Sequence, residues 1–137
     1  MLKLTICRWF ALCAVGWAAM PSLLAADTTP PILIQVSPTP GVATNLSRVS
    51  VTFSEPVTGV LLSSLRVNDV GCQSFSQSGT TYTFTFAQPA FGPAQFTWDP
   101  AVAIFDLASP PNRFDPFREK ATFFYELVDA SAPVVAE

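Results

Sequence analysis

The chain has 137 residues, 12% of them charged, no histidine, and a formal net charge of −3. The absence of histidine excludes catalytic groups built on imidazole and most transition-metal sites. Because the net charge is negative, the sequence predicts neither a basic surface for nucleic acid nor a basic stripe for anionic lipid.

Residues 1–26 have the pattern of a secretory signal peptide. Lys3 and Arg8 give a basic start, and an apolar run follows over residues 9–20, which is too short to span a bilayer. Small residues precede a predicted cleavage before Asp27. We therefore expect an exported protein, secreted or at the cell surface, with no membrane attachment after cleavage. The alternative is an uncleaved anchor.

The region after the predicted cleavage site is acidic and has one cysteine. Of the 7 basic and 10 acidic residues, only Lys3 and Arg8 precede Asp27, so residues 27–137 carry 5 against 10, a net charge of −5. Cys72 has no partner for a disulfide within this region. We expect it to be a small core residue. A reactive thiol or a cross-link to another chain is the alternative.

Helix signals are nearly absent, and short alternating segments separated by turn residues predict β-strands. The expected strands cover 32–36, 48–53, 65–70, 81–86, 94–98, 104–105 and 121–127, with loops at 77–80 and 110–116. About seven short strands with polar outer faces predict an all-β, antiparallel sandwich or barrel. The side chains expected to point inward are Phe53, Tyr82, Phe84, Phe86, Phe96, Trp98, Phe123 and Tyr125.

A nine-residue pattern occurs twice, 102 residues apart. Residues 27–35 and 129–137 both fit Asp-x-Ser/Thr-x-Pro, two branched aliphatic residues, one further residue, and Gln or Glu. The spacing equals the length of one small β-sandwich. We therefore expect one module over 27–128, followed at 129–137 by a linker and the start of a second, truncated module.

Several motifs resemble the bacterial immunoglobulin-like domains found in tandem on large secreted and surface proteins. The matching residues, in order, are Asp27 and Pro31; Ser37, Pro38 and Gly41; the Val-Thr-Phe-Ser-Glu-Pro-Val string at 51–57; Tyr82 and Phe84; Asp106 and Ala108; and Asp129. The resemblance covers residues 27–128 and implies an immunoglobulin-like β-sandwich. The family's Asp-x-Ala-Gly-Asn pattern is incomplete here, because the Gly is missing and Asn112 is displaced.

The resemblance also implies a function. Such domains act as spacers or adhesive modules and not as enzymes, and their partners are neighbouring immunoglobulin-like modules and, in some cases, surface proteins or glycans. The sequence leaves two alternatives open: a carbohydrate-binding module, and an accessory domain next to an extracellular enzyme. A sugar platform needs exposed aromatic rings, and Phe124, out of phase with its neighbours, is the best candidate. Phe91, Phe105, Phe114 and Phe117 are not placed by the pattern.

Calcium is the one metal that the sequence leaves open, and no other cofactor is expected. Hard oxygen ligands stiffen the junctions of some extracellular arrays, and Asp27, Asp106 and Asp129 are the candidate ligands. The alternative is that Asp27 and Asp129 cap turns with their side-chain oxygens. The pattern favours capping, because it contains no acidic loop of the Asp-x-Asp-x-Asp kind.

Overall fold

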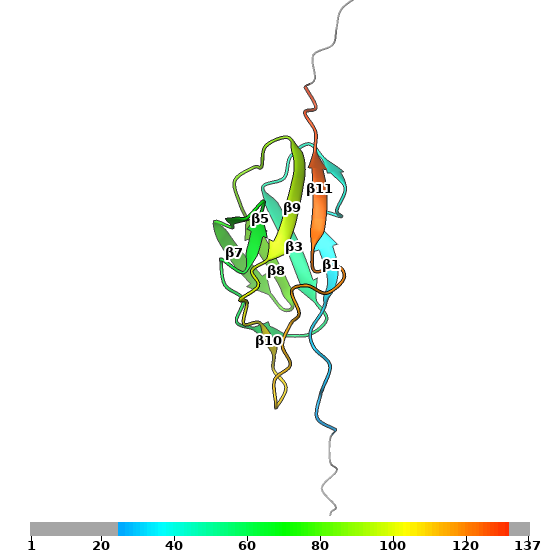
Figure 1. The fold of residues 1–137 in the computed structure, drawn as a ribbon, viewed down its shortest axis with the longest axis vertical. Coiled ribbons are helices and arrows are strands. Elements are labelled where there is room, and N and C mark those ends of the chain that lie inside the picture. The colour runs from blue at the N-terminus through cyan, green and yellow to red at the C-terminus, as the bar shows by residue number, and fades with distance from the viewer. Residues whose placement is uncertain (1–24, 132–137) are drawn as a thin grey trace, which may run out of the picture.

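The computed structural model describes residues 25–131, which form eleven β-strands and no helix. Two sheets face each other, so the chain is an all-β sandwich, as predicted (Figure 1). Most of the predicted signal peptide, residues 1–24, and residues 132–137 of the second repeat lie outside the described residues. Within 25–131 there is no helix with the length and apolar character needed to cross a membrane.

The first sheet contains four antiparallel strands. Their order is β1 (Leu33–Ser37), β3 (Arg48–Phe53), β8 (Thr81–Thr85) and β7 (Ser74–Ser78). The register between β3 and β8 sets Val51 opposite Tyr82 and Val49 opposite Phe84. All four side chains are buried, because alternate residues of a strand point to the same face.

The second sheet contains five strands, in the order β2 (Val42–Ala43), β11 (Phe123–Leu127), β9 (Gly92–Trp98), β5 (Leu65–Val67) and β6 (Val70–Gly71). β2 and β11 are parallel, and the other pairs are antiparallel. A separate two-stranded ladder joins β4 (Val57–Thr58) to β10 (Phe105–Asp106). This ladder lies at the end of the sandwich where the N-terminal segment enters (Figure 1).

The core between the sheets is aromatic. The eight predicted inward side chains are all buried: Phe53, Tyr82, Phe84, Phe86, Phe96, Trp98, Phe123 and Tyr125. Phe96 stacks on Phe123 with ring centroids 5.0 Å apart. Phe114 lies edge-on to Trp98 at 5.2 Å and is buried, so the loop 110–116 contributes a ring to the core. The core residues form one cluster drawn from Leu33 to Leu127.

The outer faces are polar, as the alternation predicts. On the first sheet, the hydroxyls of Ser50 and Thr83 lie 2.8 Å apart, and those of Thr52 and Thr81 lie 2.9 Å apart. These threonines are half-buried by their neighbours. Phe124 on β11 is 55% exposed, as expected from its phase.

The prediction of about seven strands is wrong in number. Residues 65–70 form two strands, because Asn68 and Asp69 adopt positive φ angles of 46° and 65° and make a tight turn between Val67 and Val70. β7 covers part of the predicted loop 77–80. Its five residues are all exposed, so its sequence shows no alternation of buried and exposed positions. β2 and β4 have two residues each, too few for a periodic signal.

Cys72 is a buried core residue, as predicted. Its thiol donates to the carbonyl oxygen of Leu65 at 3.3 Å. Burial raises the pKa of the Cys72 thiol to about 11, so the nucleophilic thiolate is scarce at neutral pH.

Candidate functional site

The short ladder brings an acidic residue to the N-terminal end of the sandwich. β10 pairs with β4 so that Asp106 lies opposite Val57. Val57 comes two residues after Glu55 in the chain. Asp106 is only 2% exposed. A buried carboxylate requires hydrogen bonds or a cation to offset its lost hydration.

Asn112 supplies much of that compensation. Its backbone N–H donates to Asp106 Oδ1 at 2.7 Å, and its side-chain amide donates to Oδ2 at 2.7 Å. The N–H of Ala108 also donates to Oδ1, at 3.1 Å. Asn112, which follows the loop 107–111, is thus bonded to Asp106, which precedes it, and these bonds close the loop. The asparagine that is displaced relative to the family pattern therefore still reaches Asp106.

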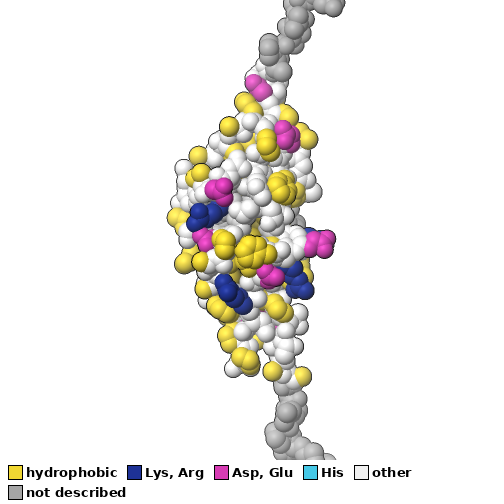
Figure 2. Space-filling model, in the orientation of Figure 1, with side chains coloured by type: hydrophobic (Ala, Val, Ile, Leu, Met, Phe, Trp, Pro, Cys, Tyr) yellow, Lys and Arg dark blue, Asp and Glu magenta, His cyan; other side chains and the backbone are white. Residues whose placement is uncertain are grey.

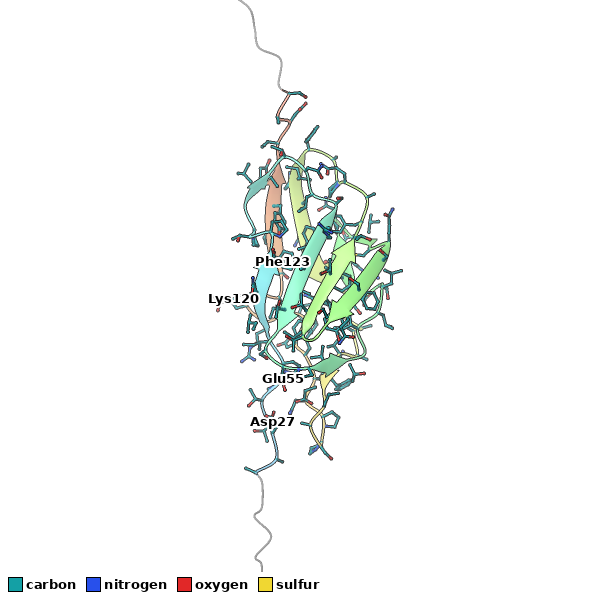
Figure 3. The ribbon with its side chains drawn as sticks, turned by 180° about the vertical axis from the view of Figure 1, so that it is seen from behind. Asp27, Glu55, Lys120 and Phe123 are labelled. Carbon is teal, nitrogen blue, oxygen red and sulfur yellow. The ribbon has the colours of Figure 1, made fainter. Side chains whose placement is uncertain are left out.

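Asp27 joins this end of the molecule from the entering chain. Its Oδ1 accepts the N–H of Thr29 at 2.9 Å, and its main-chain carbonyl accepts the amide of Asn112 at 3.0 Å. Asp27, Glu55 and Asp106 each offer one carboxylate oxygen, and these oxygens lie within 4.8 Å of one another. Asp27 and Glu55 are labelled at this end in Figure 3. We call these three residues the acidic cluster.

The pKa values of two carboxyl groups in the cluster shift in opposite directions, for different reasons. Burial raises the pKa of Asp106, but hydrogen bonds from the side chain and backbone of Asn112 and the backbone of Ala108 outweigh burial and leave the pKa below its usual value. The pKa of Glu55 is raised, first by burial and then by the negative charges of Asp27 and Asp106. Like charges at this distance disfavour ionisation of the least compensated member.

The sequence-predicted candidates do not all meet in one place. The structure brings together Asp27 and Asp106, but Asp129 lies after β11, and the two ends of the described chain leave at opposite poles (Figure 1). Glu55 is the member of the acidic cluster that is not among the sequence-predicted candidate ligands. The signal that pointed to it was its place in the string at 51–57, the most specific motif of the resemblance.

Asp27 and Asp129 both cap turns, as the capping alternative predicts. Oδ1 of Asp129 accepts the backbone N–H of Ser131 at 2.8 Å and its hydroxyl at 2.6 Å. These hydrogen bonds lower the pKa of Asp129. The N–H of Thr29 makes the matching bond to Asp27. The first three residues of the two copies therefore share one hydrogen bond, from the backbone N–H of the third residue to the aspartate side chain, at opposite poles.

The acidic cluster offers the carboxylate oxygens that calcium prefers, but some of these oxygens already accept hydrogen bonds. Both oxygens of Asp106 accept hydrogen bonds from N–H groups. The carboxylate of Glu55 and Oδ2 of Asp27 accept no hydrogen bond among the described residues. Calcium sites typically use six to eight oxygen ligands, so the three carboxylates alone would supply only part of a coordination shell.

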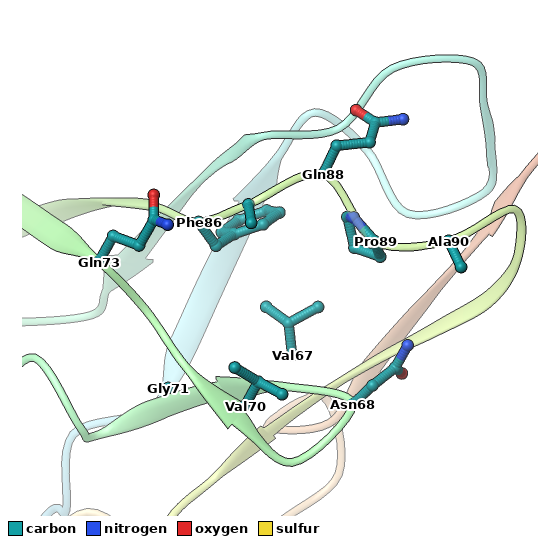
Figure 4. Close-up of a pocket in the computed structure, with 10 residues that line it drawn as sticks. Val67, Asn68, Val70, Gly71, Gln73, Phe86, Gln88, Pro89 and Ala90 are labelled. Atoms are coloured by element: carbon teal, nitrogen blue, oxygen red, sulfur yellow. The ribbon is translucent and has the colours of Figure 1, made fainter.

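A second candidate is a pocket of about 320 Å³, lined by residues of β5 and β6 and by the segment 86–90 (Figure 4). Its apolar lining includes Val67, Val70, Phe86 and Pro89, and its polar lining residues are Asn68, Gln73 and Gln88. Phe86 is only 5% exposed, so the pocket presents little ring face to a ligand. Gln88 Oε1 already accepts the N–H of Leu46 at 2.9 Å.

A third candidate is a groove of about 410 Å³ between β1 and the start of β11. Leu33 and Phe123 lie at its buried side, and Ile34 and Lys120 are exposed at its rim. Lys120 and Phe123 are labelled beside β1 in Figure 3. β2 pairs with β11 only at Glu126 and Leu127. The groove therefore lies beside the first part of β11, which β2 does not cover.

The face of the molecule in Figure 2 shows no concentration of one charge, because its basic and acidic side chains are few and interspersed with apolar and uncharged ones. The most exposed aromatic rings among residues 25–131, those of Phe91, Phe117 and Phe124, come from three separate segments of the chain. Comparisons with known protein families, curated proteins and solved structures find no match to this chain.

Proposed function

We propose that this chain is an exported, non-catalytic immunoglobulin-like module, which acts as a spacer or adhesive unit in a tandem array of such modules. The repeated sequence carries the proposal. Asp27 and Asp129 lie 102 residues apart in matching sequence, and each accepts the backbone N–H of the residue two positions later, at the two poles. A chain that repeats its own entry sequence directly after its last strand has the form expected of one unit in a series.

The strand order supports the immunoglobulin-like assignment. An immunoglobulin sandwich places strands A, B, E and D in one sheet and C, F and G in the other. Here β1, β3, β8 and β7 occupy the positions of A, B, E and D, while β5, β9 and β11 occupy those of C, F and G. β2 and β6 extend the second sheet at its two edges.

The chemistry of the side chains agrees with a non-catalytic role. The chain has no histidine, and its most buried acid, Asp106, is held by Asn112 within a loop. Cys72 is buried, with a raised pKa. The serine and threonine hydroxyls need an activating base to act as nucleophiles.

The pocket in Figure 4 supports a second candidate, a carbohydrate-binding module, because the exposed Gln73 lines it together with apolar side chains such as Val67, Val70 and Phe86. A glycan array probed with residues 25–131 separates the two functions. A spacer, or a module that adheres to other proteins, binds no glycan in this pocket. Specific binding that is lost in Gln73→Ala and retained in Gln35→Ala, a matched exposed glutamine on β1, would establish the carbohydrate-binding role instead.

A further inference from the structure

The pole at which the chain leaves the sandwich carries exposed apolar side chains. Val42 is 74% exposed, Phe91 59% and Val128 37%. We call these three residues the exit collar. They are neighbours in space, because Leu127 pairs with both Ala43 and Gly92, and the N–H of Val128 donates to the carbonyl of Ala43 at 2.9 Å.

The opposite pole carries an apolar projection. The loop 107–111, which we call the entry loop, extends beyond the sandwich beside the N-terminal segment (Figure 1). Leu107 is 70% exposed, and Pro110 and Pro111 are also exposed. The hydrogen bonds between Asp106 and Asn112 close the base of the loop. The projection is therefore anchored at both of its ends.

The entering chain is fastened to this loop. The carbonyl of Asp27 accepts the side-chain amide of Asn112, which follows the entry loop directly. Asp129, the counterpart of Asp27, comes immediately after Val128 of the exit collar. Consecutive Cα atoms are only about 3.8 Å apart. A following module that begins at Asp129 would thus bring its own entry loop next to the exit collar.

We propose that the exit collar binds the entry loop of the following module, a second copy of this fold, and makes a stiff apolar joint. This proposal rests on the tandem array proposed above and names the surfaces that meet in it. Clustered apolar side chains at a pole favour contact with another apolar surface. Free partners need a buried interface of about 1,000 Å², but a covalent link supplies an effective concentration in the mM range, so a small contact suffices.

A two-module protein tests the joint: residues 27–128 followed directly by residues 27–131. Each copy contains the whole core cluster, and a single copy of 27–131 checks that the module folds alone. The measurement is the rotational correlation time of each module from ¹⁵N relaxation. We expect both modules to share one value, clearly above that of the single copy.

The substitutions have matched controls within the same protein. The double substitution Val42→Ser and Phe91→Ser in the first module should lower both correlation times toward that of the single copy. Leu107→Ser in the second module should have the same effect. Identical substitutions in the non-contacting copy, Val42→Ser with Phe91→Ser in the second module or Leu107→Ser in the first, should have no effect. Unchanged melting of each variant confirms that the modules stay folded.

Two results would overturn the joint. One is independent tumbling of the two modules in the unsubstituted protein. The other is an equal effect of the substitutions in contacting and non-contacting copies. Neither result touches the tandem array itself, which fails instead if the parent protein has no second module beginning at Asp129. An array with freely tumbling modules would remain a spacer, but one with flexible joints.

Discussion

Asn112 binds both carboxylate oxygens of Asp106, one through its backbone N–H and one through its side-chain amide, each at 2.7 Å. The same amide reaches the carbonyl of Asp27. A single residue therefore compensates a buried charge, closes the entry loop and holds the entering chain. These contacts make Asn112 a central structural residue of the N-terminal pole.

We expect Asn112→Ala to lower the unfolding midpoint at neutral pH, because it leaves the buried carboxylate of Asp106 short of a donor. The folded pKa of Asp106 lies below its usual value, so its ionised form stabilises the protein above that usual value, and the contribution is lost as pH falls through the folded pKa. Asp106→Asn should therefore reduce the loss of stability in acid. Thermal melts between pH 2 and 7 measure both effects. An unchanged midpoint in Asn112→Ala would contradict this account.

The pKa of Glu55 shifts in the direction opposite to that of Asp106, so its effect on stability has the opposite pH dependence. Its folded pKa is raised, so its contribution to stability is present below the unfolded pKa and is lost as pH rises through the folded pKa. We expect Glu55→Gln to raise the melting temperature at pH 7, with chelator present, and to lose this gain below the usual pKa of a glutamate. Glu126→Gln, an exposed position on β11 outside the cluster, is the control. A lower melting temperature for Glu55→Gln at pH 7 would refute the like-charge argument.

We expect calcium to leave the melting temperature of the isolated module unchanged, because the oxygens of Asp106 already accept three hydrogen bonds. A ligand that binds only the folded state, at a hundred times its Kd, would stabilise it by about 2.7 kcal/mol, which a thermal melt detects readily. A calcium-dependent rise that disappears in Glu55→Gln and Asp106→Asn, and persists in Asp129→Asn, would instead establish the acidic cluster as a calcium site.

The core should respond far more strongly than the outer face. Trp98→Ala should destabilise the module by about 3–5 kcal/mol, because it empties a large site packed against Phe114. Thr83→Ala removes one hydroxyl bonded to Ser50 and should cost about 0.5–1.5 kcal/mol. Phe124→Ala, at an exposed position, should stay within about 0.5 kcal/mol. Denaturant unfolding ranks the three variants, and a cost for Thr83→Ala equal to that of Trp98→Ala would be inconsistent with this core.

The sequence predicted the aromatic core because burial in a strand repeats every second residue, as at Tyr82 and Phe84. It did not predict β7, whose five exposed residues are defined only by pairing with β8. The parallel contact of β2 with β11 joins residues more than 80 positions apart, and no local pattern encodes such a pairing. Very short strands depend on tertiary structure rather than on propensity.

The candidate site was predicted only in part, for a related reason. Asp27 and Asp106 were named from the motifs, and the structure brings them together. Glu55 joins them because β4 pairs with β10, a long-range contact that the sequence does not reveal. Asn112 stands six residues after Asp106 instead of in the usual position, and its role appears only once the loop between them is folded.

The last prediction concerns residues 130–137. Residues 132–137 lie outside the described part of the chain, and the sequence predicts that 129–137 form a linker and the start of a second module. Val128 is the last residue that the described hydrogen bonds tie to the sandwich, through the carbonyl of Ala43. Deletion of 130–137 should therefore leave the unfolding midpoint almost unchanged, because an isolated first strand is not stable alone.

Amide exchange on the full chain provides the independent measurement. Val134 and Val135 should exchange rapidly, whereas Val49 and Val51 in β3 should be protected. In the competing arrangement, the segment 129–137 completes this same sandwich as an edge strand. In that arrangement Val134 and Val135 would be protected, and the deletion would cost several kcal/mol by removing buried apolar side chains. That pair of results would remove the main support for the tandem array, since the repeated sequence would then belong to one module instead of two.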